Sequence, residues 1–126
     1  MVDDFEPWRD LLCSTLRQHP DLQIVGEAED GLQAIQKAAE LRPDLILLDI
    51  GLPSLNGIEV AHRISQLLPT AKMLFVSEQS DPEIVAAALN NGACGYILKT
   101  NAATELLRGI AAVLRGETFV SPQRRP

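Results

Sequence analysis

Asp49 is the residue in this sequence best placed to do chemistry. It follows four apolar residues, 45–48, and precedes a loop that contains Gly51, Pro53 and Gly57. An apolar run of this length between turn residues is typical of a strand buried on both faces of a parallel sheet. Ligands and chemistry gather beyond the carboxyl ends of such strands. Because a carboxylate placed there is costly to desolvate, we expect Asp49 to have partners.

Four other residues could meet Asp49. Asp3 and Asp4 precede the first predicted helix, and Ser77 and Lys99 each end a later apolar run. Three carboxylates without a nearby base in sequence indicate a hard divalent cation, and Mg²⁺ prefers carboxylate and water oxygens. Ser77 could donate a hydrogen bond to a phosphoryl oxygen, and Lys99 would add a compact positive charge. The set predicts phosphoryl transfer to the Asp49 carboxylate.

Each of these residues also has an ordinary structural explanation. An acid pair before a helix usually caps it, a serine after a strand usually forms a turn, and a lysine is usually solvated. The functional interpretation depends on their joint occurrence, each at the end of a successive strand.

The elements that would position these residues are strands alternating with helices. The alternation and the short loops predict right-handed crossovers and a parallel sheet with helices on both faces. Because parallel strands end at one edge, the five polar residues should converge there. We expect helices over 6–18, 31–41, 57–68, 84–89 (opened by 81–83) and 102–114, and strands over 22–28, 45–48, 71–76 and 95–99.

Composition bounds the class of protein. A chain of 126 residues can form one domain with its own core, and a net charge of -6 argues against this chain alone gripping nucleic acid. The sequence lacks the run of about 20 apolar residues that a membrane span requires. Cys13 and Cys94 show no metal-binding spacing, and we expect both to be reduced.

Four segments together resemble the receiver domain of bacterial two-component response regulators. They are Asp3-Asp4, residues 49–53 running to Gly57, Ser77, and residues 95–99. The resemblance covers nearly the whole chain. It implies a flavodoxin-like (CheY-like) α/β fold, with a doubly wound parallel sheet of five strands in the order 2-1-3-4-5, helices on both faces and, here, a truncated first strand.

The resemblance also implies roles for the acidic residues. Asp49 corresponds to the phosphoacceptor. Asp3, Asp4, Asp49 and the backbone carbonyl of Gly51 correspond to the ligands of Mg²⁺.

Three further residues correspond to the remaining working parts of such receivers. Lys99 corresponds to the lysine that bridges to the phosphate, and Ser77 and Tyr96 correspond to the switch hydroxyl and the switch aromatic. A small shift of the Ser77 loop toward the phosphate would admit Tyr96 and change the partner surface.

Residues 99–118 resemble the NarL/FixJ subfamily, whose receivers usually control a LuxR-type, DNA-binding output domain. This implies a sensor histidine kinase as partner, a role in transcription regulation and a cytoplasmic location. We expect that a homodimer can form through apolar or small-residue faces of the first, fourth or fifth helix, and that this domain alone binds neither nucleic acid nor membrane. We expect residues 1–117 to form the receiver and 118–126 to begin a linker to an output domain absent from this sequence.

Three positions depart from the family pattern. Only Met1 and Val2 stand where about five strand residues are expected, which suggests a mis-set start or a truncation. We expect the open position to be filled by a partner chain or another segment, or the sheet to be loosened. Glu78 follows Ser77, and we favour a side chain that faces solvent. Thr100 stands where proline often follows the lysine, which leaves the isomer of that peptide bond open.

Two other functions are compatible with parts of the pattern. A degenerate receiver would act as an interaction module without phosphorylation. An aspartyl-phosphate phosphatase would need a second carboxylate two residues after the nucleophile, where this chain has Gly51, and neither His19 nor His62 lies near. We therefore expect a signalling module rather than an enzyme.

Overall fold

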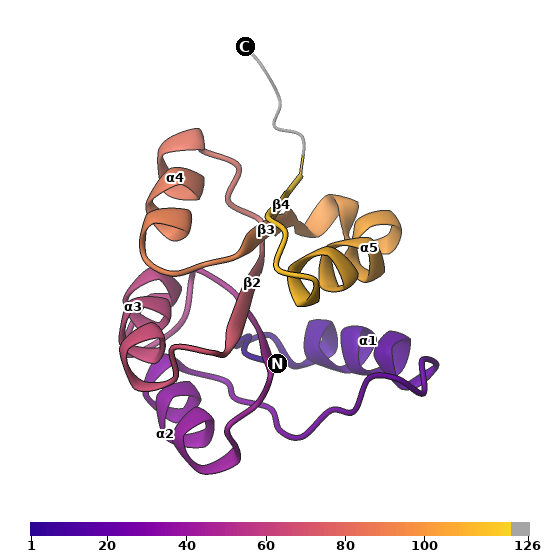
Figure 1. Ribbon diagram of the computed structural model, residues 1–126, viewed down its shortest axis with the longest axis horizontal. Coiled ribbons are helices and arrows are strands. Elements are labelled where there is room, and N and C mark those ends of the chain that lie inside the picture. Colours follow the sequence, from indigo (N-terminus) through magenta and orange to yellow (C-terminus); the bar gives the residue numbers. More distant parts are fainter. Residues whose placement is uncertain (122–126) are drawn as a thin grey trace.

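The computed structural model describes residues 1–121 and shows a parallel sheet with helices on both faces (Figure 1). The four strands are β1 (Leu45–Leu48), β2 (Lys72–Ser77), β3 (Gly95–Leu98) and β4 (Phe119–Val120), and they lie side by side in that order. All three strand pairs are parallel. Parallel neighbours need crossover connections, and helices supply them here. The predicted α/β class is confirmed.

The helices cover the sheet unequally. α2 (Gly31–Leu41), α3 (Gly57–Leu67) and α4 (Pro82–Asn90) pack on one face, and α1 (Glu6–Arg17) and α5 (Ala102–Leu114) pack on the other (Figure 1). Successive strand residues point to opposite faces, which divides the core into two apolar clusters. A short 3₁₀ helix, η1 (Lys99–Asn101), connects β3 to α5. Among the described residues no helix is long and apolar enough to cross a membrane.

Three helices on the same face begin at a side-chain cap. The carboxylate or amide oxygen of the capping residue accepts a hydrogen bond from a backbone N–H of the first turn, which would otherwise lack a partner. The capping residues are Asp30 for α2, Asn56 for α3 and Asp81 for α4.

The strand predicted over 22–28 does not form, and this part of the prediction was wrong. Only Ala28 takes part in a ladder, through an isolated parallel bridge to Val2. Val2 makes a second isolated bridge, to Leu48 of β1. A strand needs a neighbour along its length, and the truncated first strand offers one residue. In the expected order 2-1-3-4-5, strands 2 and 1 are therefore each represented by a single bridged residue, Ala28 and Val2. Val2 lies between Ala28 and Leu48 of β1, as that order requires.

A cavity of about 440 Å³ lies beside β1 where the rest of a first strand would run. Its walls include Ile24, in the stretch predicted as a strand, and Leu41 at the end of α2. Leu16 of α1 and Ile110 of α5 line it as well. Lys72 N donates to the carbonyl of Asp44, the residue before β1. The backbone N–H and C=O groups of the even-numbered residues of β1 therefore point toward β2. The backbone of residues 45 and 47 consequently faces the cavity side.

β4 lies in the stretch that we expected to begin a linker. Ser121 N donates to the carbonyl of Tyr96 over 2.8 Å, and Leu98 N donates to Ser121 Oγ over 3.1 Å. The Ser121 hydroxyl in turn donates to the buried carboxylate of Glu105. The chain is therefore held against β3 as far as residue 121. The boundary at 117/118 stays a prediction, and residues 122–126 lie outside the described part.

Candidate functional site

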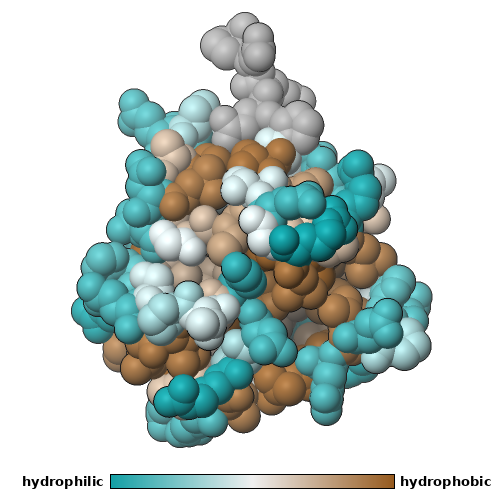
Figure 2. All heavy atoms as spheres, viewed as in Figure 1, coloured by the Kyte–Doolittle hydropathy of each residue, from teal (hydrophilic) through white to brown (hydrophobic). Residues whose placement is uncertain are grey.

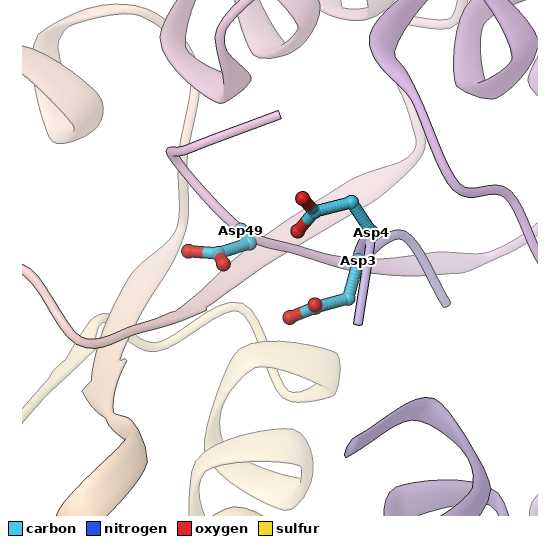
Figure 3. A group of neighbouring side chains, drawn as sticks. All are labelled: Asp3, Asp4 and Asp49. Atoms are coloured by element: carbon cyan, nitrogen blue, oxygen red, sulfur yellow. The ribbon is translucent and has the colours of Figure 1, made fainter. Parts of the chain in front are cut away.

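Three carboxylates gather at the carboxyl end of β1. Figure 3 shows Asp3, Asp4 and Asp49 reaching into one region from two adjacent backbone segments. One oxygen of each lies within 4.8 Å of the other two. Asp3 is 2% exposed and Asp49 9% exposed, while Asp4 is open to solvent. The cluster is thus anchored in the core and accessible from one side.

The single remaining residue of the first strand holds the two segments together. Val2 N donates to the carbonyl of Leu47 over 2.8 Å, and Asp49 N donates to the carbonyl of Val2 over 3.0 Å. Asp3 and Asp4 follow Val2 directly, so this pair of bonds brings them beside Asp49. The truncated strand is long enough to position the acid pair.

The loop after Asp49 requires a glycine at one position. Gly57 N donates to the carbonyl of Ile50 over 2.7 Å, and a Cβ on Gly57 would lie 1.9 Å from the carbonyl oxygen of Asp49. Ile50 N also donates to Asp49 Oδ1 over 2.7 Å. The loop therefore fixes both the backbone and one carboxylate oxygen of Asp49.

Lys99 lies between two of the carboxylates. Its Nζ is 2.7 Å from Asp3 Oδ2 and 3.2 Å from Asp49 Oδ2, and it lies 5.2 Å from the centre of the Trp8 ring. It is the first residue of η1 (Lys99–Asn101), directly after β3. Lys99 thereby links the end of β3 to Asp49 at the end of β1 and to Asp3 beside it.

The pKa values follow from burial and charge. Burial raises the pKa of Asp3, although the hydrogen bonds from Lys99 and from Phe5 N oppose the shift. Burial alone would lower the pKa of Lys99, but the Asp3 and Asp49 carboxylates together raise it. Three carboxylates against one ammonium leave an excess of negative charge, which a divalent cation would balance.

Ser77 and Tyr96 meet at the loop that follows β2. Ser77 Oγ accepts a hydrogen bond from Gln79 N over 3.2 Å, and the Tyr96 hydroxyl donates to the Gln79 carbonyl over 2.7 Å. Both side chains are buried, and the Tyr96 ring packs against Phe75. Burial raises the pKa of Tyr96, with Ser77 opposing the shift. The aromatic ring thus occupies an inward position.

The remaining predicted positions can be placed individually. Gly51 is exposed, and its carbonyl as a metal ligand stays a prediction. Glu78 is exposed, in line with a side chain that faces solvent. The bond between Lys99 and Thr100 is trans, because no peptide bond among the described residues is cis.

Sequence reasoning missed two residues of α1 that reach the site. Trp8 lies in the helix predicted over 6–18 and was not expected at the site, yet its ring lies against the Lys99 ammonium. Arg9 donates to the backbone carbonyl of Asp3 and approaches Glu27 at 3.5 Å. The one available signal was their place in the first turn of the helix that follows the acid pair.

Comparison with known proteins gives consistent matches. The family described as the response regulator receiver domain matches residues 1–111. The response regulator protein VraR of Staphylococcus aureus (strain Mu3 / ATCC 700698) is 37% identical over 122 residues, which are 97% of this chain and 58% of that protein.

Two solved structures are also similar. A LuxR-family two-component response regulator from Aurantimonas sp. SI85-9A1 has a TM-score of 0.92 and 30% identity, covering 96% of this chain and 86% of the other. The signal receiver domain of the putative response regulator NarL from Mycobacterium tuberculosis has a TM-score of 0.85 and 33% identity, covering 92% and 94%. The chain spans about half the length of the curated relatives it matches, from 52% to 58%.

Proposed function

This chain belongs to the response regulator receiver domain family, and from that premise we propose that Asp49 accepts a phosphoryl group from a sensor histidine kinase. Its relatives are LuxR- and NarL-type response regulators, so its role is in phosphorylation-dependent signalling. The proposed outcome of phosphorylation is control of a DNA-binding output domain in transcription.

The position of Lys99 is the observation that carries the proposal. A lysine held by Asp3 and Asp49 neutralises part of a three-carboxylate cluster without filling it. The oxygen donors and the excess negative charge fit Mg²⁺, with Asp3, Asp4 and Asp49 as the side-chain ligands and the Gly51 carbonyl as a fourth. Bound there, Mg²⁺ would neutralise charge on the phosphoryl oxygens during transfer.

The two oxygens of Asp49 have different surroundings. Oδ1 accepts from Ile50 N, and Oδ2 faces Lys99. Oδ2 is the nucleophile in this proposal: its bond to phosphorus forms while the bond to the donor atom breaks, and the donor keeps that electron pair. Lys99 then follows the negative charge from the carboxylates to the phosphoryl oxygens.

Ser77 and Tyr96 supply the switching step of the proposal. Both currently bond to Gln79, so a Ser77 hydroxyl that turned toward the phosphate would release Gln79 N. The Tyr96 hydroxyl donates to the carbonyl of the same Gln79. A movement of either side chain would therefore shift the loop between β2 and α4.

The test is phosphorylation of the chain by a small donor such as acetyl phosphate with Mg²⁺, followed by intact mass. We expect a mass increase of one phosphoryl group that is stable in acid and labile in base. Asp49→Ala should abolish it, and Asp44→Ala, which alters an exposed carboxylate outside the site, should retain it.

The truncated first strand favours one second candidate. With its first strand reduced to the bridges of Val2, the chain could serve as an interaction module that does not take phosphate. A folded parent chain that gains no mass would support that function and overturn the first. Rapid turnover with release of phosphate would indicate a phosphatase instead.

A homodimer also belongs to the proposal. Apolar side chains reach the surface near α1 and α5 in Figure 2. The exposed large apolar residues of these two helices and of the residue before α1 are Phe5, Leu11, Leu107 and Leu114. These two helices are one candidate face, with α4 as the alternative.

A further inference from the structure

Trp8 is the only tryptophan of the chain and the third residue of α1. Its ring centre lies 5.2 Å from Lys99 Nζ, within the range of a cation–π interaction. Within residues 1–121 the ammonium has two ion-pair partners, the carboxylates of Asp3 and Asp49, and one aromatic neighbour, the face of this ring. Only the ring is neutral.

We propose that Trp8 is a positioning residue for Lys99, whose ring holds the ammonium beside the phosphoacceptor once the cation and the phosphoryl group engage Asp3 and Asp49. This inference rests on the proposed function, because it assigns Trp8 a part in the same transfer.

Competition for the carboxylates makes a third contact necessary. Asp3 and Asp49 are the two side chains that bond to Lys99, and both are also proposed ligands of the cation. A carboxylate oxygen that binds a metal is less available to an ammonium. Lysine has a flexible four-carbon stem, so Lys99 needs another contact to stay oriented after the cation engages the carboxylates and before the phosphoryl oxygens are in reach. The Trp8 ring is not in that competition.

The indole N–H shows that packing alone does not explain tryptophan at this position. Trp8 Nε1 is buried and has no hydrogen-bond partner among the described residues. Buried indole N–H groups usually find a partner, and an unsatisfied donor lowers stability. Leucine or phenylalanine would fill the same apolar surroundings without that cost. What tryptophan supplies best is its ring face, the strongest cation–π partner among the side chains.

The contact can be measured directly by NMR. The Cε protons of Lys99 should be shifted upfield by the Trp8 ring current, while Lys37 and Lys72, which have no ring contact in the structure, serve as internal controls. We expect the Lys99 shift to persist when Mg²⁺ and beryllofluoride are added. It should be smaller in Trp8→Phe and absent in Trp8→Leu.

The kinetic test uses the same variants with acetyl phosphate and Mg²⁺. We expect Trp8→Leu to slow phosphorylation roughly three- to tenfold and Trp8→Phe to stay within about twofold of the parent. In a Lys99→Met background, Trp8→Leu should have no further effect, because the two residues act as a pair. Thermal unfolding of each variant checks that it is folded.

Three results would overturn the inference. The first is a Lys99 shift that disappears on loading with Mg²⁺ and beryllofluoride. The second is an unchanged rate in folded Trp8→Leu, and the third is equal slowing in the Lys99→Met background. If the parent itself gains no phosphoryl group while the Lys99 shift is present, the contact stands but its role in transfer fails with the proposed function.

Discussion

At the scale of residues, the backbone around Asp49 is as constrained as its carboxylate. Asp49 Oδ1 is held by Ile50 N, and the carbonyl of Asp49 faces Gly57 at a distance that leaves no room for a side chain. The loop therefore has little room for a side chain at Gly57 but ample room at Gly51, and the effect of alanine on stability can be compared at these two positions.

Gly57→Ala should destabilise the chain by about 2 kcal/mol or more, because the new Cβ would force the Asp49 backbone to move. Gly51→Ala is the control, since a Cβ there meets nothing within 4 Å. Urea unfolding of both variants measures the difference. Equal stability of the two would contradict the observed loop geometry.

The raised pKa of Asp3 predicts a pH dependence of stability. The folded chain binds the Asp3 proton more tightly than the unfolded chain, where the pKa is near 3.8. The resulting stability is fully present below that value and is lost as the pH rises through the higher folded pKa.

Metal-free Asp3→Asn should lack this component of the pH dependence of the free energy of unfolding. Asp10→Asn, at an exposed position on α1, should keep it. Urea unfolding across acidic pH measures both slopes. A slope in Asp3→Asn equal to that of the parent would show that another group is responsible.

Residue spacing predicted most of the site, and it could do so for a physical reason. Parallel strands end at one edge, so Asp3, Asp4, Asp49, Ser77 and Lys99 were expected to converge. The structure brings the three carboxylates and Lys99 together, whereas the Ser77 hydroxyl bonds within the loop after β2. Trp8 was missed because it is on α1 while its partner Lys99 follows β3. How a helix packs against the end of a strand cannot be read from residue spacing.

At the scale of elements, the first strand has been reduced to one residue with two bridges. The sequence of 22–28 favours a strand, but strand formation also depends on a neighbour that this chain offers only at Val2. β4 was missed for the opposite reason. Two residues are too few for a pattern, and they form a strand because β3 offers its edge.

The cavity beside β1 predicts that an added strand would stabilise the chain. Five apolar, β-branched residues fused before Met1 should raise Tm by more than about 5 °C, because burial of one aliphatic side chain contributes about 2 kcal/mol and about 1 kcal/mol shifts Tm by about 4 °C. Calorimetry against a Gly/Ser extension of equal length is the measurement. No gain over that control would mean that the cavity does not accept a strand.

At the scale of the whole molecule, a single acidic domain carries a site at the carboxyl ends of its strands, and residues 119–121 lie along the outer side of β3. The prediction that this chain alone does not bind nucleic acid is based on its net charge of -6 and stays a prediction. The chain spans about half of its curated relatives, and its control of a DNA-binding output domain stays a proposal. Ser121 is the last described residue, and its backbone N–H donates to the carbonyl of Tyr96, so the described part of the chain ends next to the proposed switch.

The central claim is that Asp49 carries the phosphoryl group, and chemical mapping tests it most directly. The chain is treated with acetyl phosphate and Mg²⁺ and reduced with borohydride, which converts an aspartyl phosphate to homoserine. Peptide sequencing by mass spectrometry then locates that residue. We predict homoserine at position 49 and none at positions 3 or 4. Homoserine at another position, or none in a folded and Mg²⁺-treated chain, would contradict the account.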